Sequence, residues 1–176
     1  MPVTIPHPPK TMLEVWETLP EGTLCQLINN NLVMSPSPLD IHQVVLNDIN
    51  IEISIFLQKN HLGKIRIAPY DVHFSKQNIL QPDIIFIANN NLGKIDKNGL
   101  KGAPDMVIEI LSPSTSHYDM DDKKLIYERY GVKEYFIVEP NSKYVYAFVL
   151  QNEEFVEVKT ETATIVSTLL NTTIEF

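Results

Sequence analysis

The segment that decides the fold runs from Ala103 to Pro140 and reads APDMVIEILSPSTSHYDMDDKKLIYERYGVKEYFIVEP. Its pattern predicts a strand, a loop, a helix and a second strand, in that order. The first strand, Asp105 to Leu111, is apolar on both faces, which is typical of an interior strand that is covered on both sides. Glu109 departs from this pattern, because it places a carboxylate on a face that we expect to be buried. Such a charge is costly unless a metal, a cation or a hydrogen-bond donor meets it.

The helix after this strand carries a lysine toward the same face. Three aspartates between residues 119 and 122 suit a helix N-terminus, and Gly131 suits its end. In steps of three and four residues, one helical face carries Met120, Lys123, Ile126, Tyr127 and Tyr130. We therefore expect Lys123, and not Lys124, to point toward the sheet that bears Glu109.

A second apolar strand, Gln81 to Ile87, opens with a Pro-Asp pair that places Asp83 at its start. Asp83, Glu109 and Lys123 would then put two carboxylates and one ammonium on neighbouring elements, an arrangement found in metal-dependent enzymes that cleave phosphodiester bonds. The structural alternative is a buried Glu109–Lys123 pair that ties helix to strand, with Asp83 capping a turn. In that reading, Asp119 and Lys123 form an ordinary ion pair on the helix surface.

Four segments resemble the Uma-two family of putative restriction endonucleases, which belongs to the PD-(D/E)XK nuclease superfamily. They read LVMSPSPLDIHQ, QPDIIFI, APDMVIEILSPSTS and DMDDKKLIYERYGVKEYFIVEP. The resemblance makes Asp83 the motif aspartate and Glu109 the motif glutamate. The usual lysine position, two residues after the glutamate, holds Leu111. The resemblance places the lysine on the following helix, at Lys123, which is also the residue that the helical face selects.

The resemblance implies a metal-dependent endonuclease that hydrolyses phosphodiester bonds of DNA. Asp83 and Glu109 present hard oxygen ligands that suit Mg²⁺ or Mn²⁺. By resemblance, the backbone carbonyl of Ile110 would be a further metal ligand. Lys123 would orient or deprotonate the attacking water, and we expect burial to lower the pKa of its ammonium group.

Three residues are candidates for accessory roles. Gln26 stands where family members usually carry a glutamate, so a third acidic ligand is absent. His42 matches a family histidine, and it either positions a loop through a hydrogen bond or binds the metal. Asp71 lies on a strand with a polar face and is either an exposed carboxylate or an alternative metal ligand. Gln26 favours the alternative function, a catalytically impaired nuclease-fold protein that serves as a nucleic-acid-binding or dimeric scaffold module.

Composition limits the class of protein. The chain has 176 residues, 44% of them hydrophobic, which suits one nuclease-like domain over residues 11–176 after a flexible, Pro-rich lead-in of residues 1–10. We expect no membrane span, because no long apolar run is present, and no organic cofactor, because no nucleotide-binding glycine motif is present. The single cysteine fits a reducing cytoplasm. The net charge of −8 argues against a general nucleic-acid coat, so a surface that binds DNA has to be local.

The remaining patterns predict an α/β (α+β) fold of the restriction-endonuclease type, with a central mixed β-sheet flanked by helices. Residues 89–102 read as a polar loop, and the C-terminal strands either finish the sheet or pack a homodimer. The other expected elements are a helix at 11–19, a hairpin at 24–34 with three asparagines at its tip, a long helix at 39–59, and strands at 64–68, 70–74, 144–150, 155–158, 165–170 and 173–176.

Overall fold

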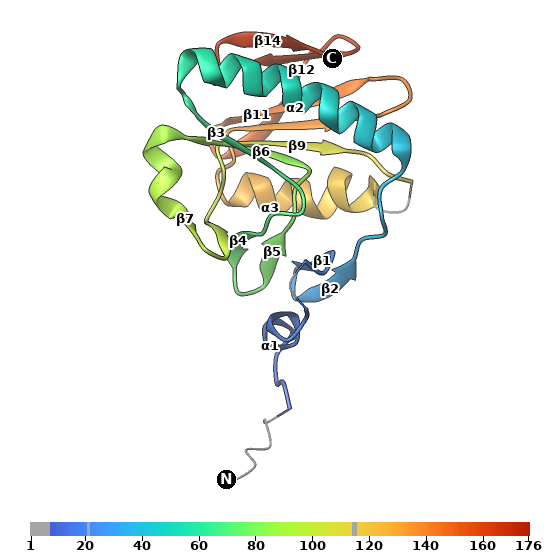
Figure 1. Ribbon diagram of the computed structural model, residues 1–176, viewed down its shortest axis with the longest axis vertical. Coiled ribbons are helices and arrows are strands. Elements are labelled where there is room, and N and C mark those ends of the chain that lie inside the picture. Colours follow the sequence, from blue (N-terminus) through green and yellow to red (C-terminus); the bar gives the residue numbers. More distant parts are fainter. Residues whose placement is uncertain (1–7, 21, 114–115) are drawn as a thin grey trace.

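The computed structural model describes residues 8–20, 22–113 and 116–176, so most of the expected N-terminal lead-in lies outside the described residues (Figure 1). Its helices are α1 (Met12–Glu17), α2 (Asp40–Asn60) and α3 (Lys123–Arg129), with a 3₁₀ helix at Asn89–Lys94 and a π-helical turn at Tyr118–Asp122. No described helix is both long enough and apolar enough to cross a lipid bilayer.

Two six-stranded mixed sheets form the framework. The first, the β9 sheet, has the order β12 (Glu154–Val158), β11 (Val145–Gln151), β10 (Glu134–Val138), β9 (Met106–Ile110), β6 (Ile84–Ala88), β3 (Gly63–Ile67). The second, the β1 sheet, has the order β2 (Asn31–Met34), β1 (Cys25–Ile28), β5 (Asn78–Leu80), β4 (Val72–Ser75), β8 (Gly99–Lys101), β7 (Ile95–Asp96). A separate hairpin joins β13 (Thr164–Ser167) to β14 (Thr172–Glu175). The mixed α/β class is confirmed, whereas the sequence did not predict the second six-stranded sheet.

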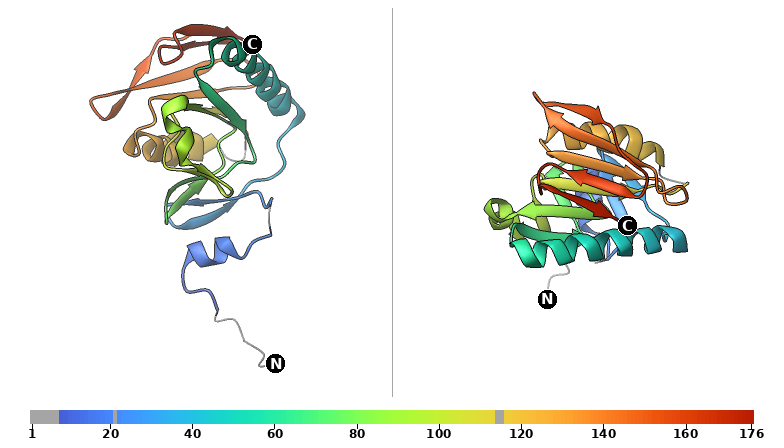
Figure 2. Two further views of the ribbon diagram at one scale, coloured as in Figure 1. Left: turned by 60° about the vertical axis from the view of Figure 1, so that its left-hand side comes forward. Right: turned by 90° about the horizontal axis from the view of Figure 1, so that it is seen from above.

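Strand β9 is interior, as its two apolar faces indicate. One face packs under α2, where Ile108 and Ile110 join Ile49 and Ile53 in one core, and the β13–β14 hairpin belongs to the same core (Figure 2). The other face packs against α3, in a second core that contains Val107. β10 runs parallel to β9 and β6 runs antiparallel to it. Glu109, which alternates with Ile108 and Ile110, therefore lies on the α3 side of the sheet.

Several local signals form as expected. The side chain of Thr11 accepts a hydrogen bond from the Glu14 amide and caps α1. Asn29 and Asn30 take positive φ angles of 48° and 64° at the tip of the β1–β2 hairpin. Gly131 follows α3 with φ 80°, a conformation that glycine adopts without steric cost.

The prediction of a polar loop at residues 89–102 is wrong, because the segment folds into the 3₁₀ helix and strands β7 and β8. The segment is held in place by Asp105, a role that the sequence pattern did not predict. Its carboxylate accepts hydrogen bonds from the Ala88 amide and from the side chain of Asn91, and it pairs with Lys133 at 2.8 Å. These contacts hold the start of the segment against β9.

We expect Asp105→Asn to lower the free energy of unfolding by about 1.5–3 kcal/mol near neutral pH, because charge-assisted hydrogen bonds are lost from a buried group. Burial alone would raise the pKa of Asp105, but hydrogen bonds from Lys133, Ala88 and Asn91 lower it below its ordinary value of 3.8. The stabilisation is therefore complete above pH 3.8 and is lost as the pH falls through the lower folded-state pKa. Urea unfolding of both proteins over this range should show the difference between them shrink only in acid. Asp96→Asn, at a largely exposed position, is the control, and an equal loss there would contradict the assignment.

Candidate active site

The centre of the site is the Glu109 carboxylate at the end of β9. Glu109 Oε1 accepts hydrogen bonds from Lys123 Nζ at 2.9 Å and from the Tyr127 hydroxyl at 2.6 Å. Lys123 and Tyr127 are one turn apart on α3, so both reach the same oxygen. All three side chains are buried. Lys124 points elsewhere, with its ammonium 3.8 Å from the centre of the Phe148 ring, so the structure places Lys123 against Glu109 as the helical face indicates.

A third buried carboxylate, Asp119, completes the surroundings of the lysine. Its Oδ1 lies 2.8 Å from Lys123 Nζ, and the residue is only 3% exposed. The expectation of a surface ion pair is therefore wrong. The π-helical turn carries Asp119 inward, and the Tyr135 hydroxyl donates to the Asp119 carbonyl from β10, which fixes this turn over the sheet. The i,i+4 spacing from Lys123 was the signal in the sequence that could have placed Asp119 inside.

Charges within this cluster set its protonation. Burial would lower the pKa of Lys123, but the charges of Asp119 and Glu109 and the hydrogen bond that Lys123 donates to Asp119 raise it above its ordinary value. The expectation of a lowered pKa is therefore wrong, and Lys123 is a fixed cation near neutral pH. Burial raises the pKa of Glu109 to about 7, with Lys123 opposing this shift and Asp119 and Asp83 adding to it.

Asp83 joins the cluster from the residue just before β6. Its amide donates to Glu109 Oε2 at 3.2 Å. Its own Oδ2 accepts from the Ile110 amide at 2.8 Å and hydrogen-bonds to His42 Nε2 at 3.1 Å. Burial would lower the pKa of His42, but the hydrogen bond and the charge of Asp83 raise it above 6.5. In the part of the chain that the structure describes, His42 Nδ1 is buried and has no hydrogen-bond partner.

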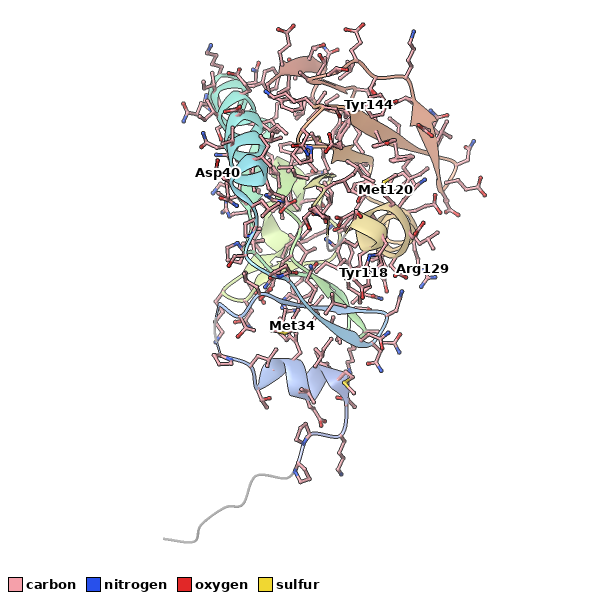
Figure 3. All side chains as sticks on the ribbon, turned by 90° about the vertical axis from the view of Figure 1, so that its right-hand side faces the viewer. Met34, Asp40, Tyr118, Met120, Arg129 and Tyr144 are labelled. Atoms are coloured by element: carbon pink, nitrogen blue, oxygen red, sulfur yellow. The ribbon has the colours of Figure 1, made fainter. Side chains whose placement is uncertain are left out.

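The site lies where three parts of the chain meet. Asp40 marks the start of α2 on one side, Tyr118 and Met120 mark the turn before α3 on the other, and Met34 of β2 lies below (Figure 3). The motif residues thus come from the residue that precedes β6, from β9 and from α3, with His42 added from α2.

Comparisons with known proteins identify the family and the fold of the chain. The model of the Uma2 family, described as "Putative restriction endonuclease", matches residues 12–175. The chain belongs to the Uma2 family. Among solved structures, the chain is similar to a protein from Anabaena variabilis ATCC 29413 described as a putative nuclease belonging to DUF820. The two share 17% sequence identity with a TM-score of 0.75, over 93% of this chain and 92% of that one, which shows a common fold. No curated protein matches the chain.

Membership of the Uma2 family and the shared fold support a nuclease function in general. Nucleases of the restriction-endonuclease type are generally metal-dependent, and the donor atoms at this site suit such an ion. Asp83, Glu109 and Asp119 bring three carboxylates against one fixed ammonium, so negative charge is in excess. Among the described residues, no group of three or more His, Cys, Asp or Glu side chains is already arranged to hold a metal ion.

The other two accessory candidates are Gln26, which stands where Uma2 members usually carry a glutamate, and Asp71, which the polar face of its strand singles out. Gln26 Oε1 accepts a hydrogen bond from the backbone amide of Gln81 at 3.0 Å. This bond links β1 to the segment that leads into Asp83, two residues after Gln81. Asp71 Oδ1 accepts from the Gln81 side chain at 2.8 Å. In the described residues, neither Gln26 nor Asp71 hydrogen-bonds to Asp83 or Glu109, and their roles as ligands stay predictions.

Proposed function

We propose that this protein is a metal-dependent endonuclease that hydrolyses phosphodiester bonds of DNA at Asp83, Glu109 and Lys123. One observation carries the proposal: a single carboxylate, that of Glu109, accepts hydrogen bonds from both the Lys123 ammonium and the Asp83 amide. The Asp83 carboxylate accepts from the amide of Ile110, the residue next to Glu109, and these contacts support a site shared by the two carboxylates and the cation. This is the set of groups that phosphodiester hydrolysis requires.

Each residue has a part that follows from its contacts. Asp83 and Glu109 would hold Mg²⁺ or Mn²⁺, with the Ile110 carbonyl as the further ligand. When bound, such an ion polarises the phosphate and lowers the pKa of the attacking water. Lys123, charged and held between Glu109 and Asp119, offsets negative charge on the phosphate as it develops. His42 and the Ile110 amide fix the orientation of the Asp83 carboxylate.

Plasmid nicking is the direct test of this proposal. We expect cleavage with Mn²⁺, weaker cleavage with Mg²⁺ and none in EDTA, because Mg²⁺ demands near-ideal octahedral geometry, whereas Mn²⁺ tolerates a less regular set of ligands. The readout is the conversion of supercoiled plasmid to nicked and linear forms on a gel. Cleavage that persists in EDTA would show that the activity is independent of metal, and no cleavage with either ion would contradict an endonuclease.

The alternative is a nuclease-fold protein that binds nucleic acid, or serves as a dimeric scaffold, without cutting. One observation favours it: both Glu109 oxygens already accept hydrogen bonds within the protein, Oε1 from Lys123 and Tyr127 and Oε2 from Asp83. Such a protein would bind an oligonucleotide in EDTA yet leave the plasmid intact in every metal. A pure scaffold would be a dimer by light scattering and would bind no oligonucleotide.

A further inference from the structure

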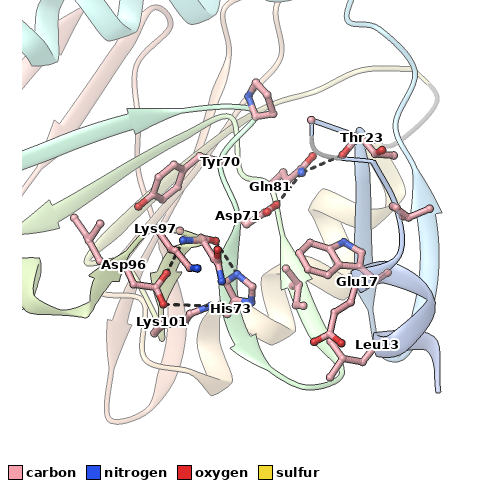
Figure 4. Close-up of a pocket in the computed structure, with 18 of the residues that line it drawn as sticks. Leu13, Glu17, Thr23, Tyr70, Asp71, His73, Gln81, Asp96, Lys97 and Lys101 are labelled. Carbon is pink, nitrogen blue, oxygen red and sulfur yellow. Dashed lines mark hydrogen bonds and ion pairs between the residues drawn. The ribbon is translucent and has the colours of Figure 1, made fainter. Parts of the chain in front are cut away.

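A groove of about 1130 Å³ lies beside the active site, between α1 and strands β4, β7 and β8 (Figure 4). Small-molecule sites usually measure about 300–1,000 Å³, so this groove is larger than one small ligand needs.

The charge of the groove differs from that of the whole protein. The complete chain has 14 basic and 22 acidic residues, whereas the groove is lined by four basic and three acidic ones. Asp96 lies 3.8 Å from Lys101, so these two charges offset each other, and Asp71 accepts a hydrogen bond from the neutral side chain of Gln81. The basic residues come from separate parts of the sequence and meet only in the fold: Arg66, Lys76, Lys97 and Lys101.

Aromatic rings lie among these cations. Trp16 lines the groove, and its indole Nε1 donates to the Cys25 carbonyl at 3.0 Å, which fixes the ring. Tyr70 also lines it, with the guanidinium of Arg66 5.9 Å from the centre of the ring. Proteins that bind single-stranded nucleic acids combine a basic groove that follows the backbone with rings on which unpaired bases stack.

Two residues in the wall of the groove lie close along the chain to the backbone of Asp83. Gln81 lines the groove, and Asp83 is two residues further along the chain. Pro69 also lines it, and the amide of Ala68, one residue earlier, donates to the Asp83 carbonyl at 2.9 Å. The backbone that forms this wall therefore also carries Asp83.

We propose that this groove binds a single nucleic-acid strand next to the phosphate that is cut. The inference rests on the proposed nuclease function and adds its substrate class: a nucleic acid with unpaired nucleotides beside the cleavage point. Lys97 and Lys101 contact the backbone, and the rings of Trp16 and Tyr70 accept bases. Glu17 and Asp71, acidic residues of the groove for which no ion pair is seen among the described residues, oppose binding.

Fluorescence anisotropy in EDTA tests binding apart from cleavage. The probe is a labelled DNA of about 12 nucleotides, used single-stranded and as a duplex, within the range of about 4–16 nucleotides that single-strand sites cover. The variant Lys97→Glu/Lys101→Glu should weaken binding of the single strand at least about tenfold and reduce the slope of log Kd against log salt by about 1.4, or 0.7 per lost contact. The matched control is Lys59→Glu/Lys64→Glu, with the same change in net charge outside the groove, and it should change Kd less than about threefold. Glu17→Gln should tighten binding.

A kinetic measurement separates the two proposals. With Mn²⁺, the groove variant should raise KM for the single strand and leave kcat unchanged, because the groove holds substrate and does not touch the reacting phosphate. Cleavage with equal effects of the groove and control variants would overturn the groove and leave the nuclease intact. Groove-dependent binding without cleavage would overturn the nuclease alone. Tighter binding of the duplex, or no binding of either DNA, would overturn the groove as a single-strand site.

Discussion

Asp83→Asn and Glu109→Gln are each expected to lower the rate of Mn²⁺-dependent DNA cleavage by at least about 10³-fold while leaving the Kd for an oligonucleotide unchanged. Each substitution keeps the shape of the side chain and removes one of the two negative charges that offset the ion. Loss of a single charge-stabilising group commonly costs 10²–10³ in rate, and here the lost group also holds the ion that supplies the nucleophile. The measurement is a single-turnover rate at saturating protein.

The matched control for these variants is Asp121→Asn, on the exposed side of the π-helical turn. It should cleave at the wild-type rate. Anisotropy in EDTA separates loss of catalysis from loss of substrate binding, and urea unfolding shows whether each variant is folded. Wild-type cleavage by folded Asp83→Asn or Glu109→Gln would mean that the activity comes from another site or from a contaminant.

Lys123→Met should lower the free energy of unfolding by about 3–5 kcal/mol near neutral pH, because removal of one partner leaves the Glu109 and Asp119 carboxylates buried without their cation. It should also lower the rate of cleavage by about 10²–10³-fold. The adjacent Lys124→Met is the control, since that ammonium only contacts the face of the Phe148 ring, an interaction of about 0.5–1 kcal/mol at exposed sites.

The origin of the destabilisation can be tested within the same cluster. Adding Asp119→Asn to Lys123→Met should recover part of the lost stability, because one unpaired carboxylate is removed, although the rate of cleavage should not recover. Urea unfolding of the two single variants and the double variant gives the coupling energy between the two side chains. Additive losses in the double variant would show that Lys123 and Asp119 do not stabilise each other.

The sequence predicted those parts of the structure that local pattern controls. The two apolar faces of β9 placed Glu109 inside, and the helical spacing of α3 selected Lys123 over Lys124. The asparagine tip of the β1–β2 hairpin followed from the tolerance of asparagine for positive φ. Each of these signals depends only on residues that are close together in the sequence.

Features that depend on distant residues could not be predicted in this way. Residues 89–102 are ordered by Asp105, whose bonds to Ala88 and Asn91 no local pattern reveals. The pKa of Lys123 depends on the balance between burial and two carboxylates, and burial alone suggested the wrong direction. The groove gathers Arg66, Lys76, Lys97 and Lys101 only after the β1 sheet has formed.

The most direct test of the proposed site is the position of a bound ion. Crystals soaked in Mn²⁺ and measured for anomalous scattering should show one peak in contact with carboxylate oxygens of both Asp83 and Glu109, and the same peak should be missing in Asp83→Asn. A peak held elsewhere, or none at saturating Mn²⁺ in crystals that leave the site open, would contradict the claim that these two carboxylates bind the catalytic metal.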